Sequence, residues 1–155
     1  MAIPIDRGIL IRGRPLFGAN KTYRGVLAVA LGASAGYWLQ GAVPALQPAS
    51  FRALPTLGLV FLGFALGVAA MLSELPNSFL KRQLDIAPGA PGGGSTSVFF
   101  YLLDQVDLLL GAWLVAAGWV TPTLSRVLWS ILFVVVVHQV ISMLGALLGM
   151  RATSR

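Results

Sequence analysis

The chain has 155 residues, of which 57% are hydrophobic and 10% are charged, and it contains no cysteine. This composition excludes a disulfide-bonded secreted domain and disfavours a soluble fold, because the apolar runs reach the length of a bilayer. The formal net charge is +6, and the cations flank the apolar runs rather than cover one face. That distribution favours anionic lipid head groups and a phosphate-rich substrate over nucleic acid as partners. The sequence therefore predicts an integral membrane protein.

Residues 1–25 form a basic, turn-rich segment that is too long for the basic region of a signal peptide, and no cleavage site follows it. Lys21 and Thr22 are compatible with a phosphate-binding P-loop at first sight. That motif, however, needs a glycine where Asn20 stands, and a strand before it. We interpret the segment as a polar loop at the mouth of the first span. Its cations are Arg7, Arg12, Arg14, Lys21 and Arg24.

Four apolar segments follow, each close to the roughly 20 residues that a membrane-spanning helix needs. Short turns with proline link the first segment to the second and the third to the fourth. The sequence thus predicts an all-α, polytopic membrane helix bundle with about four transmembrane helices, in a single membrane domain over residues 1–155. The spans lie near residues 26–46, 54–73, 98–118 and 127–149.

Basic residues predict how the bundle is oriented. All but two of the 11 Lys and Arg residues lie in the N-terminal segment, in the 74–97 loop or at the C-terminal tail; Arg52 and Arg126 are the exceptions. The positive-inside rule then places both termini and this loop in the cytoplasm, with the protein in the cytoplasmic membrane. Glycine pairs four residues apart inside the spans allow close helix packing, either within the chain or in a homodimer.

Residues 73–107 hold four of the five carboxylates. Asp104 and Asp107 stand three apart in an apolar run, so on a helix they share one face near its cytoplasmic end. A carboxylate inside a span costs at least ~2.5 kcal/mol, and two that are close together repel each other. The pair therefore favours a hard divalent cation such as Mg²⁺, which prefers oxygen ligands. Simple pairing with neighbouring basic residues is the alternative.

Three further features of the chain have two interpretations each. Pro76 predicts that the second helix breaks and restarts, and Lys81 and Arg82 on the restarted helix either bind phosphates or anchor the protein at the membrane surface. The glycine-rich stretch 88–97 either presents backbone N–H groups to an anion or is a flexible linker. His138, in mid-span, is more typical of an interhelical hydrogen bond than of a catalytic base.

Two blocks of polar residues have a recognisable order, and the resemblance that they carry runs in order along essentially the whole chain. The first block comprises residues 4–8, 12–18 and 20–25, and the second comprises residues 73–75, 78–82, 89–91 and 103–107. They resemble the first cytoplasmic loop, and the second loop with its following helix, of the CDP-archaeol synthase family, which is related to the phosphatidate cytidylyltransferases. Members usually have one more span before the first loop, at which this chain almost begins.

The resemblance implies a membrane nucleotidyltransferase that uses Mg²⁺ and CTP to convert a lipid phosphate into a CDP-lipid, with release of pyrophosphate. The lipid would be an ether-lipid phosphate such as digeranylgeranylglyceryl phosphate, or phosphatidic acid. The implied catalytic residues are Lys81, Arg82, Asp104 and Asp107. The implied metal ligands are Asp104, Asp107 and Glu74, which stands where the family usually has aspartate. The implied nucleotide- and phosphate-binding residues are Asn20, Lys21, Thr22, Arg24, Ser78, Lys81, Arg82 and Gly89.

Two other functions compete with this one. A small transporter or channel would use Asp104 and Asp107 to bind a transported cation inside the membrane. A non-catalytic assembly factor would use the glycine faces to pack against partners.

Overall fold

We describe the protein from a computed structural model, in which residues 3–43, 45, 47, 49–87 and 95–147 are described. These residues are mostly helical, which confirms the predicted fold class. The elements are β1 (Leu10–Ile11), β2 (Arg14–Pro15), α1 (Tyr23–Ala42), the 3-10 turn η2 (Ala49–Phe51), α2 (Thr56–Gln83), α3 (Ser95–Ala116) and α4 (Leu124–Leu147). The chain divides into two compact units, one up to Thr121 and one from Pro122 onward, and each is described by itself.

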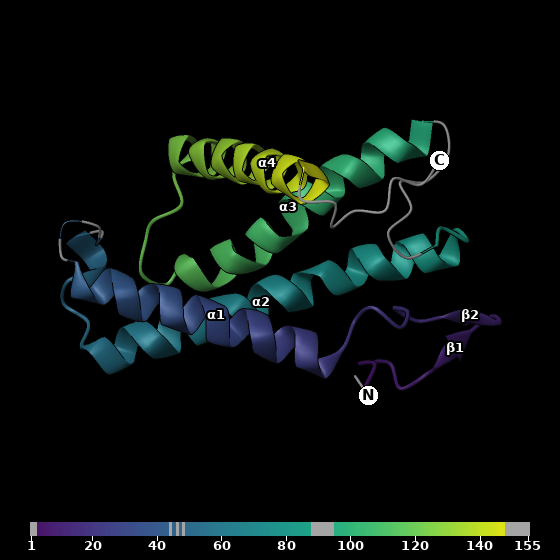
Figure 1. The fold of residues 1–155 in the computed structure, drawn as a ribbon, viewed down its shortest axis with the longest axis horizontal. Coiled ribbons are helices and arrows are strands. Elements are labelled where there is room, and N and C mark those ends of the chain that lie inside the picture. Colours follow the sequence, from purple (N-terminus) through teal and green to yellow (C-terminus); the bar gives the residue numbers. More distant parts are fainter. Residues whose placement is uncertain (1–2, 44, 46, 48, 88–94, 148–155) are drawn as a thin grey trace. The chain divides into compact units, whose positions relative to one another are not determined.

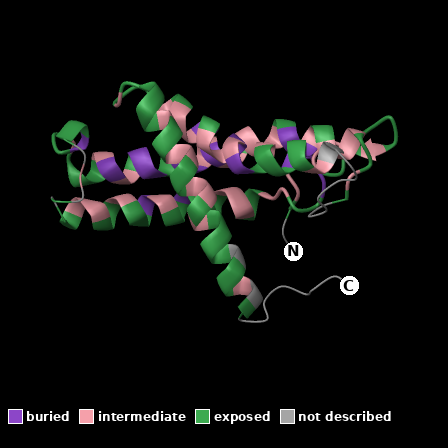
Figure 2. Ribbon diagram, turned by 90° about the horizontal axis from the view of Figure 1, so that it is seen from above, coloured by how far each residue is buried: buried purple, intermediate pink, exposed green. Residues whose placement is uncertain are grey.

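In the first unit, α2 is the central helix and contacts α1, α3 and β2 (Figure 1). The strands β1 and β2 form a short antiparallel hairpin in which Ile11 pairs with Arg14. The buried apolar core lies around the first half of α2, at Leu59, Leu62 and Leu66, while much of the remaining helix surface is exposed (Figure 2). Broad exposure of apolar side chains is expected where lipid replaces water.

Glycines of α2 bring that helix against α1. A Cβ atom added at Gly67 would lie 2.6 Å from Cα of Ala30, and one at Gly63 would lie 2.7 Å from the carbonyl oxygen of Ala33. Because backbone atoms cannot move aside cheaply, only glycine allows the two helices to approach this closely. The structure thus assigns this pair to packing within the chain. The homodimer stays a prediction.

The continuity of α2 corrects the expected break at Pro76. The helix runs without interruption from Thr56 to Gln83, with Pro76 inside it, so residues 74–83 are helical rather than part of a loop. Proline removes one helical hydrogen bond, but side-chain contacts from the following turns to α3, described below, hold the helix in place. At 1.5 Å per residue, 28 residues span about 42 Å, which exceeds the roughly 30 Å hydrocarbon core of a bilayer.

Three helical segments are long and apolar enough to cross a membrane: Thr56–Gln83, Ser97–Ala116 and Leu124–Gly145. They correspond to the second, third and fourth predicted spans. The helix α1 has 20 residues and lies where the first span was expected, but it is not among these three. The count of four spans and the location of the termini therefore stay predictions.

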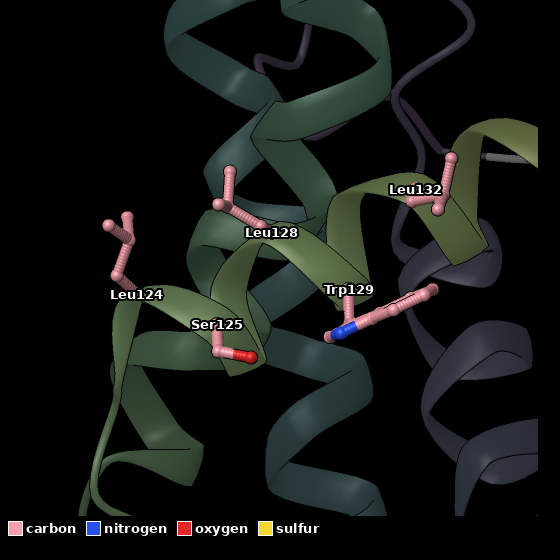
Figure 3. Close-up of a pocket in the computed structure, with 5 residues that line it drawn as sticks. All are labelled: Leu124, Ser125, Leu128, Trp129 and Leu132. Atoms are coloured by element: carbon pink, nitrogen blue, oxygen red, sulfur yellow. The ribbon is translucent and has the colours of Figure 1, made fainter.

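The second unit consists, in its described part, of α4. A shallow apolar pocket lies along this helix (Figure 3), and Ser125 contributes a hydroxyl group to its lining. The residues that line it include no charged side chain. Its lining residues are Leu124, Ser125, Leu128, Trp129 and Leu132.

Candidate active site

The polar contacts of the first unit follow one face of α2. Ser73, Asn77 and Lys81 are four residues apart, so they lie one turn above another on the same face. Ser73 Oγ lies 2.5 Å from the backbone oxygen of Asp107. Asn77 contacts the carboxylates of Asp104 and Asp107, and Lys81 contacts Asp104. As the residue numbers rise along α2, the numbers of the partner residues on α3 fall. The two helices are therefore antiparallel, and their contacts form a ladder.

Gly111 sets the spacing of this ladder. A Cβ atom at Gly111 would overlap the backbone oxygen of Ala69 and the hydroxyl of Ser73, both on α2. The two helix backbones therefore approach each other closely at Gly111, and the acidic side chains lie one and two turns from it, within hydrogen-bond distance of α2. The pattern of glycine pairs four residues apart does not include Gly111, because no second glycine stands four residues from it.

Asn77 joins the two predicted metal-binding carboxylates. Its Nδ2 donates to Oδ1 of Asp104 at 2.6 Å and to Oδ2 of Asp107 at 2.8 Å. Asn77 and Asp107 are both 5% exposed, whereas Asp104 is exposed. The spacing of the two aspartates predicted that they share a face, and the structure brings them together there. Asn77 was not expected in the site from the sequence, because its contacts depend on a second helix.

Lys81 supplies a cation beside Asp104. Its Nζ lies 2.6 Å from Oδ1 and 2.5 Å from Oδ2 of that carboxylate, and 5.5 Å from the centre of the Phe100 ring. The Lys81 side chain is 12% exposed, and Phe100 is buried. A lysine placed between a carboxylate and an aromatic face is held in one position and adds positive charge to the site. Pairing with a basic residue was the alternative to metal binding that the sequence left open for Asp104, and Lys81 makes such a pair.

Glu74 lies one turn from Asn77 on α2, where it forms an ion pair with Lys21 of the N-terminal segment. The two side chains are 16% and 20% exposed. Among the described residues, no group of three or more His, Cys, Asp or Glu side chains is close enough to hold a metal ion. The structure thus places Glu74 with Lys21 and does not gather it with Asp104 and Asp107 as a third acidic ligand.

The N-terminal loop, which we define as residues 3–22, is attached to the C-terminal end of α2. Arg82 Nε donates to the carbonyl oxygen of Phe17 at 3.3 Å. Arg14, in the hairpin, forms an ion pair with Asp85 just after the helix. These contacts hold the N-terminal loop beside the last turn of α2, which carries Lys81 and Arg82.

Asp6 organises the inside of the N-terminal loop. It is 4% exposed, and its oxygens accept hydrogen bonds from the backbone N–H groups of Gly8 at 3.0 Å, Phe17 at 2.9 Å and Gly18 at 3.0 Å. Burial raises the pKa of Asp6, but these hydrogen bonds lower it more, so the pKa lies below its usual value. No function was assigned to Asp6 from the sequence, where it stood only as part of the first block.

The remaining predicted site residues are spread around this cluster. Thr22 caps α1, since its hydroxyl oxygen accepts the N–H of the third helical residue at 3.1 Å. Asn20 and Arg24 are exposed, and Ser78 is buried in α2. Gly89 lies outside the described residues. The roles of these residues in nucleotide binding stay predictions.

The donor atoms of the cluster suit a hard divalent cation. Two carboxylates converge on one amide, and Oδ1 of that amide, from Asn77, is buried without a hydrogen-bond partner among the described residues. The carboxylate oxygens of Asp104 and Asp107 and the unpaired amide oxygen of Asn77 are hard oxygen donors of the kind that Mg²⁺ prefers. The residues present therefore fit the predicted ion.

Known proteins match this chain over most of its length. The family model of CarS-like CDP-archaeol synthases matches residues 2–154. The CDP-archaeol synthase of Methanoculleus marisnigri is 34% identical over 157 residues, which cover 96% of this chain and 87% of the relative. That of Pyrococcus furiosus is 34% identical over 111 residues, which cover 70% of this chain and 58% of the relative.

A solved structure is similar as well. It is described as an intramembrane enzyme for archaeal membrane lipid biosynthesis, and it has a TM-score of 0.71 and 28% identity over 92% of this chain and 80% of its own. These similarities give no support to a transporter or an assembly factor. Because the family model spans nearly all residues, the chain belongs to the CDP-archaeol synthase family and is an integral membrane, CTP-dependent lipid cytidylyltransferase.

Proposed function

We propose that this protein transfers the cytidylyl group of CTP to an isoprenoid ether-lipid phosphate such as digeranylgeranylglyceryl phosphate, giving a CDP-lipid and pyrophosphate. The similarity to CDP-archaeol synthases supports an ether lipid, since archaeol is one. Phosphatidic acid is the second candidate, because its phosphate offers the same nucleophile on different apolar tails.

The observation that carries the proposal is the cluster of Asn77, Lys81, Asp104 and Asp107 between α2 and α3. It combines the oxygen donors of the buried Asn77 and Asp107 and of the exposed Asp104 with the cation of Lys81, and Arg82 lies one residue beyond. Phosphoryl transfer needs groups of this kind, because most of its catalysis comes from positioning and from neutralising the charge on phosphate oxygens.

We propose that Asp104 and Asp107 hold Mg²⁺, with Asn77 as their positioning partner. The ion would supply positive charge that offsets the phosphates of CTP. Within the chain itself, Asp104 and Asp107 present carboxylate oxygens, and Lys81 and Arg82 present N–H donors that suit phosphate oxygens. Lys21, which pairs with Glu74, and Arg24 are the further candidates for phosphate binding.

The reaction needs little acid–base chemistry. An oxygen of the lipid phosphate attacks the α-phosphorus of CTP, the bond from that phosphorus to the bridging oxygen breaks, and pyrophosphate leaves with the bonding electrons. The nucleophile is already an anion, so no strong general base is required. Lys81 and Arg82 stabilise the charge that builds up on the transferred and leaving groups.

We also propose that the protein lies in the cytoplasmic membrane and that the cluster faces the cytoplasm. The basic residues near the cluster support this orientation, since loops rich in Lys and Arg stay on the cytoplasmic side. CTP is a cytoplasmic nucleotide, so a site on this side would receive its substrate directly.

The experiment is a synthesis assay with purified protein in lipid-containing detergent micelles. CTP labelled in the cytosine ring is supplied with Mg²⁺ and either digeranylgeranylglyceryl phosphate or phosphatidic acid. We expect labelled CDP-lipid and equimolar pyrophosphate with the ether lipid, and no product after chelation of the metal. Product from phosphatidic acid alone would overturn the choice of lipid, and no product from either lipid would overturn the proposed reaction.

A further inference from the structure

We propose that Asp6 is a positioning residue that holds the guanidinium group of Arg82 ready for the phosphates of the nucleotide. The inference rests on the proposed function, since it assigns Arg82 to phosphate binding. Asp6 is the one carboxylate that lies outside residues 73–107. It is 4% exposed, and its oxygens accept hydrogen bonds from three backbone N–H groups; among the described residues it pairs with no basic side chain.

A single peptide group links Asp6 to Arg82. The N–H of Gly18 and the carbonyl of Phe17 belong to the same peptide bond. Asp6 Oδ2 accepts the N–H at 3.0 Å, and the carbonyl oxygen accepts Arg82 Nε at 3.3 Å. A carboxylate at one end of this peptide dipole and a guanidinium at the other polarise the group in the same sense, which strengthens both hydrogen bonds.

The backbone at Gly18 fits this arrangement and tolerates little change. Its φ angle is +94°, in the region that favours glycine, and a Cβ atom there would lie 3.0 Å from Arg82 Nε. Asp6 fixes the turn from one side while Arg82 lies against the other. The position of the guanidinium group therefore depends on the position of this turn.

Two contacts restrict the orientation of Arg82. Its Nε donates to Phe17, and its Nη1 donates to the carbonyl oxygen of Ile86 at the end of the helix. Within the described part of the chain, Nη2 makes no hydrogen bond. An arginine whose planar group is held by backbone carbonyls on two of its nitrogens loses less freedom when it binds phosphate with the third.

The alternative interpretation is that Asp6 only stabilises the fold of the N-terminal loop. The two interpretations differ in what the removal of Asp6 does to CTP binding. A structural role lowers the amount of folded enzyme and leaves the KM for CTP of the remaining enzyme unchanged. A positioning role raises this KM, and it does so only while Arg82 is present.

The test uses the full-length protein with Asp6→Asn, Arg82→Gln and the double variant. The KM for CTP, the kcat and the thermal unfolding temperature are measured for each. We expect Asp6→Asn to raise the KM for CTP about tenfold, as for residues that orient a binding group. The double variant should match Arg82→Gln alone within about twofold, because Asp6 acts through Arg82.

Gly18→Ala gives a second approach to the same contact, should Asp6→Asn fail to fold. Its added Cβ presses on Arg82 Nε, so it should also raise the KM for CTP, and this effect should vanish in the Arg82→Gln background. Asp85→Asn is the matched control. It removes the side-chain charge that pairs with Arg14 of the same loop and leaves the backbone hydrogen bond from Asp85 to Arg82 in place, so it should leave the KM for CTP within about twofold of the wild type.

Three outcomes would overturn the inference. Additive effects of Asp6→Asn and Arg82→Gln would show that Asp6 acts on something else. A normal KM with a reduced yield of folded protein would show a purely structural role. Failure of the wild-type protein to form CDP-lipid from CTP would overturn the proposed function itself, and the role of Asp6 with it.

Discussion

The two halves of α2 lie in one unbroken helix but make contacts of opposite character. In the first half, Gly63 and Gly67 let α1 approach, and leucines fill the space around them. In the second half, Ser73, Asn77 and Lys81 contact α3 through hydrogen bonds and charge. Because a helix is rigid over this length, tight apolar packing in one half fixes where the polar residues of the other half stand.

The largest expected effect comes from the acidic pair on the polar side. Asp104→Asn and Asp107→Asn each remove a negative charge while they keep the side-chain size. We expect each to lower kcat by on the order of 1,000-fold, since charge placed at the reacting phosphates is usually the dominant catalytic effect. The synthesis assay with CTP measures it. Full activity in both variants would show that the polar half of α2 and its partners on α3 are not the reaction centre.

The next largest effect tests the apolar half of α2. Gly67→Ala forces a Cβ to within 2.6 Å of the Ala30 Cα, so α1 and α2 must separate. We expect a loss of about 1–3 kcal/mol in unfolding free energy, the usual cost of overpacking. Thermal unfolding in detergent, calibrated against a denaturant series, measures it.

Gly32→Ala is the matched control for this variant. Gly32 is also in a helix, but a Cβ added there meets nothing within 4 Å. Because alanine is the better helix former, this variant should be as stable as the wild type or slightly more so. Equal losses in the two variants would contradict the assignment of Gly67 to a close helix contact. A loss for Gly32→Ala alone would instead favour the predicted homodimer.

The sequence predicted the parts of the site that depend on spacing along one helix. Asp104 and Asp107 were expected on one face, and Lys81 was a candidate partner for them. Asn77 was missed because its function depends on a second helix. An uncharged amide is informative only once the antiparallel order of α2 and α3 brings it between the two carboxylates.

The sequence could not predict that α2 continues through Pro76. The rule that proline interrupts a helix is local, and it counts one lost hydrogen bond and a steric clash. The contacts of Asn77 and Lys81 with α3 come from residues more than 20 positions away, and they hold the turns after Pro76. Asp6 was missed for the same reason, since two of its three backbone partners are more than ten residues away.

A smaller effect concerns Glu74, which the family resemblance made a metal ligand and the structure pairs with Lys21. We expect Glu74→Gln to lower activity by less than about tenfold and to leave the Mg²⁺ concentration for half-maximal activity unchanged. The reason is that the variant leaves Lys21 partly buried without its partner, while Asp104 and Asp107 are untouched. Activity as a function of Mg²⁺ concentration measures it.

A Mg²⁺ requirement raised about 10- to 100-fold would show instead that Glu74 supports the metal site. The double variant Lys21→Met with Glu74→Gln is the control. It removes both charges together, so it should be more stable than Glu74→Gln alone if the ion pair is the whole function of Glu74.

The smallest effect we expect is a pH dependence of stability that involves Asp6, in the N-terminal loop that contacts the end of the polar half of α2. Hydrogen bonds from backbone N–H groups keep the pKa of Asp6 below its usual value despite its burial. The ionised carboxylate therefore stabilises the folded state fully above the unfolded-state pKa of about 4, and this stabilisation is lost as the pH falls through the lower folded-state pKa. Asp6→Asn cannot titrate, so the difference in unfolding temperature between wild type and variant should be constant from about pH 5 to pH 7. Below about pH 4 it should shrink. Thermal unfolding in detergent across this range measures the difference, and a gap that stays constant down to about pH 3 would show that the charge of Asp6 does not stabilise the loop.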